Sequence, residues 1–185
     1  MNKRTYVAYR RKREGKTDYK KRMAFLSSEK PRIVVRLSLK HVTAQIVAYT
    51  PQGDKILASA HSCELKKLGW NYHAGNLPSA YLTGLLLGKK AKQKKVADAI
   101  LDSGRVTSTK GNRVYAVAKG TLDAGINIPI GKEIIGDEKR LRGEHIAAYA
   151  TQVKDKNMFT KNISNGADPK QMPAQFDKIK QKIMG

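Results

Sequence analysis

Two neighbouring runs of alternating residues, 31–38 and 40–49, constrain the fold of this chain more than any other feature of its sequence. In the first run Ile33, Val35 and Leu37 point to one side, and the second run repeats the pattern. Apolar β-branched residues at a period of two are typical of half-buried strands, and a residue or two separates the runs, so we predict a β-hairpin. The opposite face is either an ordinary solvated sheet surface or a rigid binding platform. That face carries the polar side chains Arg36, Ser38, His41, Thr43 and Gln45.

Further apolar runs extend this hairpin into a sheet. Residues 51–54, Pro-Gln-Gly-Asp, are typical of a turn, and residues 55–62 read as a third antiparallel strand. Residues 96–102 predict a fourth strand, which follows a helix and is therefore expected to run parallel to a strand of the meander. The sequence thus predicts a mixed α/β (α+β) fold.

Helical periodicity predicts the elements that pack on this sheet. Asn76 is suited to cap a helix that has Pro78 in its first turn and an apolar stripe after it. Further helices are expected at about residues 113–123, 138–151 and 173–184. The predicted divisions are a basic extension (1–30), an α/β core (31–151), and a linker with a C-terminal helix (152–185). The stripe of that last helix is expected to dock on the core, on another protein or in a nucleic-acid groove.

The charge of the chain restricts its partners. Among 185 residues, 37 Lys and Arg stand against 15 Asp and Glu, a formal net charge of +22. Such an excess repels itself unless a polyanion compensates it, which favours nucleic acid over a membrane surface as the partner. No run approaches the length of a membrane span and no signal peptide is recognisable, so we expect a soluble, cytosolic protein. The single Cys63 excludes an intramolecular disulfide.

The first 30 residues combine cations with aromatic rings. Residues 1–32 hold 12 Lys and Arg against 3 acids, with Tyr6, Tyr9 and Tyr19 interleaved. Basic side chains neutralise phosphates and tyrosine rings stack on unpaired bases, so RNA contact is favoured over a solvated tail or a localisation signal. We expect this extension to order on RNA, with a short helix at residues 20–26 that docks Met23, Phe25 and Leu26 on the core.

Two later segments also suggest contacts. The loop at residues 63–76 contains Trp70, which is either a buried structural plug or an RNA-stacking surface. Lysines 89, 90, 92, 94 and 95 follow one another without an acid, and form a second phosphate-contact patch or a solvated helix end. His61, Cys63 and His73 lack the paired spacing of a metal site, so no metal and no cofactor are predicted.

Several segments together resemble one protein family. Residues 31–36 (PRIVVR), 41–46 (HVTAQI) and 57–60 (LASA) are similar to large-subunit ribosomal proteins of the L18 family. Further segments resemble the archaeal and eukaryotic branch of this family, whose eukaryotic member is called L5. These segments are 69–70 (GW), 75–85 (GNLPSAYLTGL), 119–126 (KGTLDAGI), 128–129 (IP) and 142–146 (RGEHI). The resemblance spans about residues 17–150, and the short C-terminal part makes it archaeal in type.

The resemblance implies a structural constituent of the large ribosomal subunit that binds 5S rRNA and anchors it to 23S rRNA in the central protuberance. It also implies a ribonuclease H-like topology and contacts with neighbouring large-subunit proteins. We expect RNA contacts in the basic extension, on the hairpin face, in the Trp70 loop and at the lysine patch. The predicted RNA-binding residues are Lys3, Arg4, Tyr6, Tyr9, Arg10, Arg11, Lys12, Arg13, Lys16, Tyr19, Arg22, Lys30, Arg32, Arg36, Ser38, Lys40, His41, Gln45, Trp70, Asn71, Tyr72, Asn76, Lys89 and Lys90.

Two other function classes compete with this interpretation. A metal-dependent nuclease needs clustered carboxylates, whereas residues 32–38 contain none. Asp98 and Asp102 would lie about 13 Å apart on a strand, so we predict that the chain is not an enzyme. A free RNA chaperone or a DNA-binding protein needs charge alone, and does not require the family motifs of the core.

Overall fold

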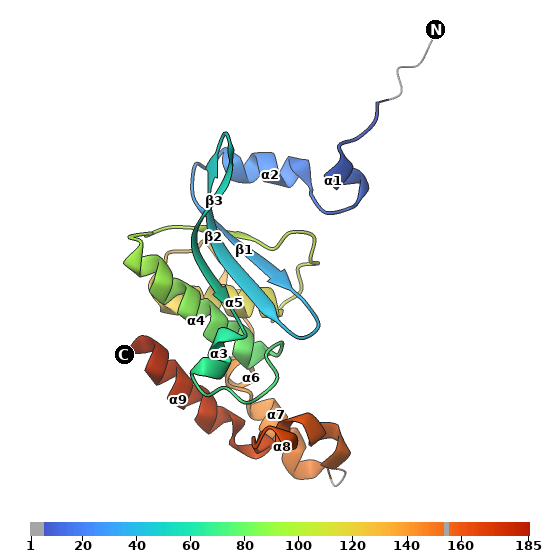
Figure 1. The fold of residues 1–185 in the computed structure, drawn as a ribbon, viewed down its shortest axis with the longest axis vertical. Helices are drawn as coiled ribbons and strands as arrows, with labels where there is room; N and C mark the ends of the chain where they lie inside the picture. The colour runs from blue at the N-terminus through green and yellow to red at the C-terminus, as the bar shows by residue number, and fades with distance from the viewer. Residues whose placement is uncertain (1–5, 154–155) are drawn as a thin grey trace.

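The structure, a computed structural model, describes residues 6–153 and 156–185. These residues form one four-stranded sheet in the order β3-β2-β1-β4, covered on one face by helices (Figure 1). The strands are β1 (Arg32–Leu37), β2 (Val42–Thr50), β3 (Gly53–His61) and β4 (Ile100–Asp102). The helices are α1 (Arg10–Arg13), α2 (Tyr19–Leu26), α3 (Glu64–Lys67), α4 (Leu77–Gln93), α5 (Arg113–Asp123), α6 (Glu138–Arg142), α7 (Glu144–Gln152), α8 (Thr160–Ser164) and α9 (Met172–Met184), with 3-10 turns η1 (Lys132–Ile134), η2 (Lys156–Phe159) and η3 (Pro169–Gln171).

The sheet confirms the predicted mixed α/β fold. β1, β2 and β3 are antiparallel, and Ile33 pairs with Ile46 across the β1–β2 hairpin. The fourth strand runs parallel to β1, with Ile33 opposite Leu101, as predicted. It is shorter than the predicted segment 96–102, because only three residues pair with β1 and Asp98 instead bridges to Asn127.

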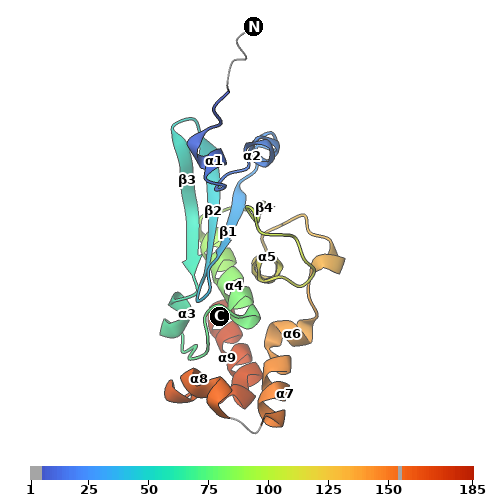
Figure 2. The ribbon, with the colours of Figure 1, turned by 90° about the vertical axis from the view of Figure 1, so that its right-hand side faces the viewer.

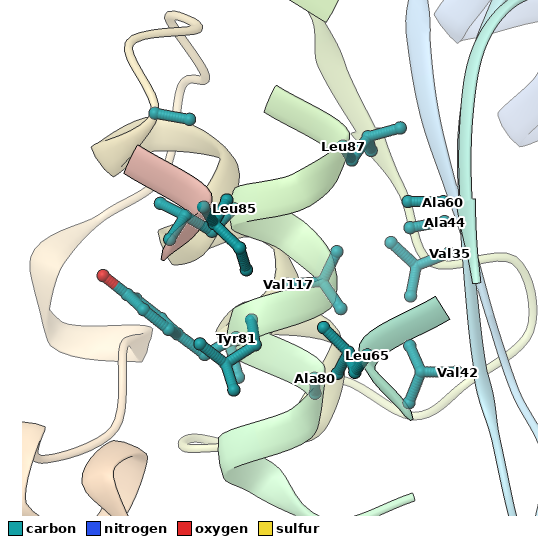
Figure 3. Close-up of a cluster of buried hydrophobic side chains, with 14 of the residues drawn as sticks. Val35, Val42, Ala44, Ala60, Leu65, Ala80, Tyr81, Leu85, Leu87 and Val117 are labelled. Carbon is teal, nitrogen blue, oxygen red and sulfur yellow. The ribbon is translucent and has the colours of Figure 1, made fainter. Parts of the chain in front are cut away.

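One face of the sheet packs on the central helix α4. Val35 of β1, Ala44 of β2 and Ala60 of β3 are fully buried, and their side chains point from the strands toward the helices (Figure 3). Leu87 of α4 and Val117 of α5 meet them from the other side. The apolar positions of the alternating pattern are therefore the ones that form the core. Burial of their apolar area is the main driving force for packing the sheet on the helices.

Helices α4 and α5 approach each other closely. A methyl group at Gly84 would overlap the carbonyl oxygen of Val117, and one at Gly120 would overlap the carbonyl oxygen of Tyr81. The boundaries predicted from sequence hold here, since α5 begins after the cap residue Asn112, whose side chain accepts a hydrogen bond from the Val114 backbone.

The C-terminal helix α9 docks on α4 rather than standing free. Phe176, Ile179 and Ile183 are buried, and the rings of Phe176 and Tyr81 lie 5.4 Å apart. Gln175 also donates a 2.7 Å hydrogen bond to the Gly69 carbonyl. Docking on the core is therefore the outcome among the three that the sequence left open.

Three local predictions are wrong. Met23 is 68% exposed and does not dock on the core, whereas Phe25 is half-buried. The helix predicted at 138–151 is broken at Gly143, whose φ of +85° separates α6 from α7. The predicted linker, 152–170, contains α8 and two 3-10 turns. Within the described ranges, no helix is both long and apolar enough to cross a bilayer.

Candidate nucleic-acid interface

A network of ion pairs between arginines and aspartates attaches the basic extension to the sheet. Arg22 of α2 donates two hydrogen bonds to Asp54 of β3, at 3.1 and 2.9 Å. Arg32 donates to Asp54 at 2.8 Å and to Asp102 at 3.2 Å. Arg36 lies 3.6 Å from the same Asp102 carboxylate. This series of ion pairs links α2, β3, β1 and β4, so it fixes where the extension lies on the sheet.

Asp54, the acid at the centre of this network, is ionised at neutral pH. Burial by itself raises the pKa of Asp54, but hydrogen bonds from Arg22 and Arg32 outweigh it and hold that pKa below the ordinary value. Asp54 is therefore a carboxylate at neutral pH, as bidentate pairing with a guanidinium requires.

A cavity of about 380 Å³ lies between the basic extension and the uncovered face of the sheet. Figures 1 and 2 place α1 and α2 at the end of the sheet where β2 turns into β3, far from α8 and α9. Of the described side chains that line it, seven are Lys or Arg and three are Asp. The cavity is therefore cationic, which suits phosphate. Its cations are Arg11, Lys16, Lys21, Arg22, Arg32, Arg36 and Arg105, and its acids are Asp18, Asp54 and Asp102.

Arg36 is a cation of this cavity that is exposed and yet held in a fixed position. Its side chain is 51% exposed, yet Nη1 donates to the carbonyls of Val35 at 2.8 Å and Asp102 at 3.2 Å. Its guanidinium lies against Gly104, where an added Cβ would come within 3.0 Å of it. Gly104 has a φ of +66°, so the turn after β4 both needs glycine and makes room for Arg36. Arg36 is thus held in place while its outer edge faces solvent.

The basic extension folds into two short helices next to the cavity. Asp18 caps α2 by accepting hydrogen bonds from the backbone of Lys20 and Lys21. The rings of Tyr9 and Tyr19 lie 5.2 Å apart, and Tyr9 is 65% exposed. Ordering of this extension on RNA stays a prediction.

The predicted contact residues fall into four groups by exposure. Lys3 and Arg4 lie outside the described residues. Exposed residues are Tyr6, Tyr9, Arg10, Arg11, Lys12, Arg13, Lys16, Lys30, Arg36, Ser38, Lys40 and Asn71. Half-buried residues are Tyr19, Arg22, His41, Gln45, Asn76, Lys89 and Lys90. Buried residues are Arg32, Trp70 and Tyr72. The exposed and half-buried contacts stay predictions, whereas the buried group needs correction.

Arg32 is a structural cation rather than a surface one. Its side chain is 4% exposed, and both ends of its guanidinium are paired with Asp54 and Asp102. The prediction that Arg32 offers its charge to RNA does not fit this arrangement, because the parallel strand β4 delivers Asp102 beside it.

The Trp70 loop is a plug, which settles the alternative that the sequence left open. Trp70 is fully buried and packs edge-on against Tyr72, with ring centroids 5.1 Å apart. The Tyr72 hydroxyl donates a 2.6 Å hydrogen bond to the Asp168 carbonyl. Asn76 caps α4 by accepting a 2.9 Å hydrogen bond from the Ser79 backbone. Neither ring has a free face for a base, so the prediction that Trp70 and Tyr72 stack on RNA is corrected.

The hairpin turn and the lysine patch lie apart from the cavity. Ser38 and His41 close the turn through their own backbone and hydroxyl groups, which leaves Lys40 exposed. Gln45, by contrast, lines the cavity. Lys90 is paired with Glu64 at 2.6 Å and donates to the Ser59 carbonyl. The predicted platform is thus divided between two ends of the sheet, and Lys90 is engaged within the fold.

Sequence reasoning missed Arg105 and the three acids of the cavity. Arg105 follows β4, and the parallel pairing of β4 with β1 brings it to the cavity that Arg36 also lines. The sequence did offer a signal for Arg105, because it is a basic residue just after a predicted parallel strand. The carboxyl ends of parallel strands share one edge of the sheet, so such a residue lies near the end of the neighbouring strand. The carboxylates proposed for a nuclease are already engaged, since Asp102 pairs with Arg32 and Asp98 accepts from Asn127.

Comparison with known proteins gives two findings. Residues 3–100 and 88–131 match the model of a family described as ribosomal large subunit proteins 60S L5 and 50S L18. The chain is also similar to the large ribosomal subunit protein uL18 of Methanococcus maripaludis, with 49% identity over 189 aligned positions. That alignment covers 100% of this chain and 98% of the relative.

Proposed function

Because this chain belongs to the family of ribosomal large-subunit proteins L5 and L18, in its archaeal-type branch, we propose that it binds 5S rRNA and anchors it to 23S rRNA in the central protuberance. Membership of this family makes the chain a structural constituent of the large ribosomal subunit and not an enzyme. The proposal concerns which RNA the chain binds, where on the large-subunit RNA it docks, and that it contacts neighbouring large-subunit proteins.

The observation that carries the proposal is the cationic cavity between the extension and the sheet. Arg36 and Arg105 lie on its sheet side, and Arg11 and Lys16 lie on its extension side. An RNA backbone at the mouth of this cavity would meet cations from two directions, while the Arg22–Asp54 pair keeps the two sides together. Shape and backbone contacts, more than base reading, are the expected basis of recognition.

The exposed tyrosines supply a second kind of contact. Tyr6 and Tyr9 are 75% and 65% exposed and lie among cationic residues. An exposed ring beside cations stacks on an unpaired base while the cations hold the neighbouring phosphates. The extension is therefore proposed to contribute salt-dependent affinity, and the sheet side to contribute specificity.

The test is to measure the affinity of the full chain for 5S rRNA and for an unrelated structured RNA of equal length across a salt series. We expect a preference for 5S rRNA of about 10³-fold or more that persists at physiological salt. Equal affinities that fall together with salt would leave only a polycation, and the proposal would fail.

A matched pair of triple variants locates the contact. Replacing Arg10, Arg11 and Lys12 of α1 by Gln is expected to reduce the salt slope by about 2, because each lost phosphate contact removes about 0.7–0.9. The control replaces three exposed lysines from the other end of the molecule, Lys139, Lys170 and Lys178. Both variants lose the same charge, so equal slopes would mean that net charge alone matters and that α1 does not contact phosphate.

A further inference from the structure

Three metal-binding side chains meet at the end of the sheet away from the basic extension. His41 directly precedes β2, His61 ends β3, and Cys63 directly precedes α3. One ligand atom from each, chosen among the ring nitrogens and the thiol sulfur, lies within 4.8 Å of the other two. His41 is distant in sequence from the other two, so the antiparallel pairing of β2 with β3 creates the cluster.

The distances suit a tetrahedral ion with little rearrangement. Cys63 Sγ lies 3.4 Å from His41 Nδ1, and the rings of His41 and His61 have centroids 5.1 Å apart. With bonds of about 2.3 Å to sulfur and 2.0–2.1 Å to nitrogen, tetrahedral ligand atoms lie about 3.3–3.6 Å apart. The sulfur and one imidazole are already at that spacing, and a ligand atom of His61 lies within 4.8 Å of both.

We propose that His41, His61 and Cys63 bind a zinc-class divalent cation, with water in the fourth position. One thiolate and two imidazoles are the donor set of a borderline-soft ion such as Zn²⁺, and do not suit Mg²⁺ or Ca²⁺. On binding, the Cys63 thiol releases its proton to solvent and the sulfur forms the metal bond. The adjacent carboxylate of Glu64 is engaged by Lys90 and by the His61 backbone, so it stays outside the donor set.

The metal-free arrangement limits the affinity. His61 Nδ1 accepts a 3.2 Å hydrogen bond from the Cys63 backbone. Coordination through either nitrogen of His61 removes this bond, because the metal takes the Nδ1 lone pair or the proton moves to Nδ1. The side chains are also half-buried or exposed, which gives an ion an open path to them.

The bound ion would join the β1–β2 turn to the junction between β3 and α3. It would stiffen the turn that presents Lys40, which is now held by hydrogen bonds between Ser38 and His41 and by a 3.4 Å hydrogen bond from Arg113 to the Ser38 carbonyl. Coordination also assigns the His41 ring to the metal, in place of the RNA contact predicted from sequence. The test below contains no RNA, so its outcome does not depend on whether the proposal for 5S rRNA holds.

The test is to titrate the reduced full chain with Co²⁺ alone, with no RNA present, and to record the absorption bands of the cobalt complex. We expect a thiolate-to-cobalt charge-transfer band together with the visible bands of a tetrahedral complex, and loss of both on adding Zn²⁺. Cys63→Ser should abolish the charge-transfer band. His41→Ala and His61→Ala should each weaken Co²⁺ binding by about tenfold or more, since even the loss of an outer-shell partner costs 10–100-fold.

His73→Ala is the matched control, because His73 lies outside the cluster and its Nδ1 accepts from the Gly75 backbone. This variant should keep the cobalt spectrum and affinity. Circular dichroism of each metal-free variant checks that it is folded, since the three ligands lie at the surface. Unchanged affinity in His41→Ala or His61→Ala, or an octahedral spectrum without the charge-transfer band, would overturn the proposal.

Discussion

The guanidinium of Arg22 makes a bidentate pair with the carboxylate of Asp54, at 3.1 and 2.9 Å, and this pair joins α2 to the start of β3. Asp54 also accepts a 2.8 Å hydrogen bond from Arg32. One acid at the β2–β3 turn therefore holds a cation from the basic extension and a buried cation of β1. The basic extension can be fixed on the basic surface of the sheet because Asp54 lies between cations of both.

Replacing Asp54 by Asn should destabilise the protein at neutral pH and matter less in acid. The folded pKa of Asp54 is lowered from its ordinary value of 3.8, so its stabilising contribution is full above pH 3.8 and is lost as pH falls through the folded pKa. Urea unfolding of wild type and Asp54→Asn across this range measures the difference. A gap between the two proteins that widens toward low pH would contradict the assignment.

Arg32→Met should lower the free energy of unfolding by about 3 kcal/mol, because it leaves the buried Asp102 carboxylate without its closest cation. Arg10→Met is the control, since Arg10 is exposed on α1 and its pair with Glu14 is solvent-screened. Urea midpoints at neutral pH make the comparison. Equal midpoints would show that the charge network does not stabilise the fold.

Arg36→Ala should weaken binding to 5S rRNA by about tenfold or more, because a hydrogen bond to a charged group contributes about 1.5–3 kcal/mol. Binding to a random RNA duplex should fall less, since Arg36 is held at one position by the Val35 and Asp102 carbonyls. Filter binding or fluorescence anisotropy at fixed salt gives both constants. Equal losses on both RNAs would remove the specific role of the sheet side.

Gly84→Ala should destabilise the protein by about 3 kcal/mol or more, because the new methyl group meets the Val117 backbone and forces α4 away from α5. Gly131→Ala is the matched control, since its Cβ meets nothing within 4 Å and its φ of −66° suits alanine. Thermal unfolding followed by circular dichroism separates the two. Similar melting temperatures would mean that the helices are less closely packed than described.

Trp70→Phe should lower stability by about 1–3 kcal/mol, less than the 3–5 kcal/mol typical of truncation to alanine, because the ring fills the core beside Tyr72. Its RNA affinity, measured where the variant is fully folded, should equal that of wild type. A selective loss of RNA affinity without loss of stability would return Trp70 to the contact surface.

Local sequence patterns determined the elements. Alternation at 33, 35 and 37 set which face of β1 is buried, and Asn76 marked where α4 begins. Their signals depend on residues a few positions away, so the sequence displays them directly. The net charge and the family motifs likewise indicated an RNA-associated ribosomal protein.

Long-range pairing decided the chemistry of the surface. Arg32 looked like a surface cation, and became a buried one because β4 places Asp102 beside it and the β2–β3 turn supplies Asp54. The pairing of β2 with β3 brought His41, and not His73, to His61 and Cys63. The sequence alone determined which side chains are charged, aromatic or able to act as metal ligands. Only the tertiary structure decided which remain available, because ion pairing and coordination act over a few ångströms between residues far apart in the chain.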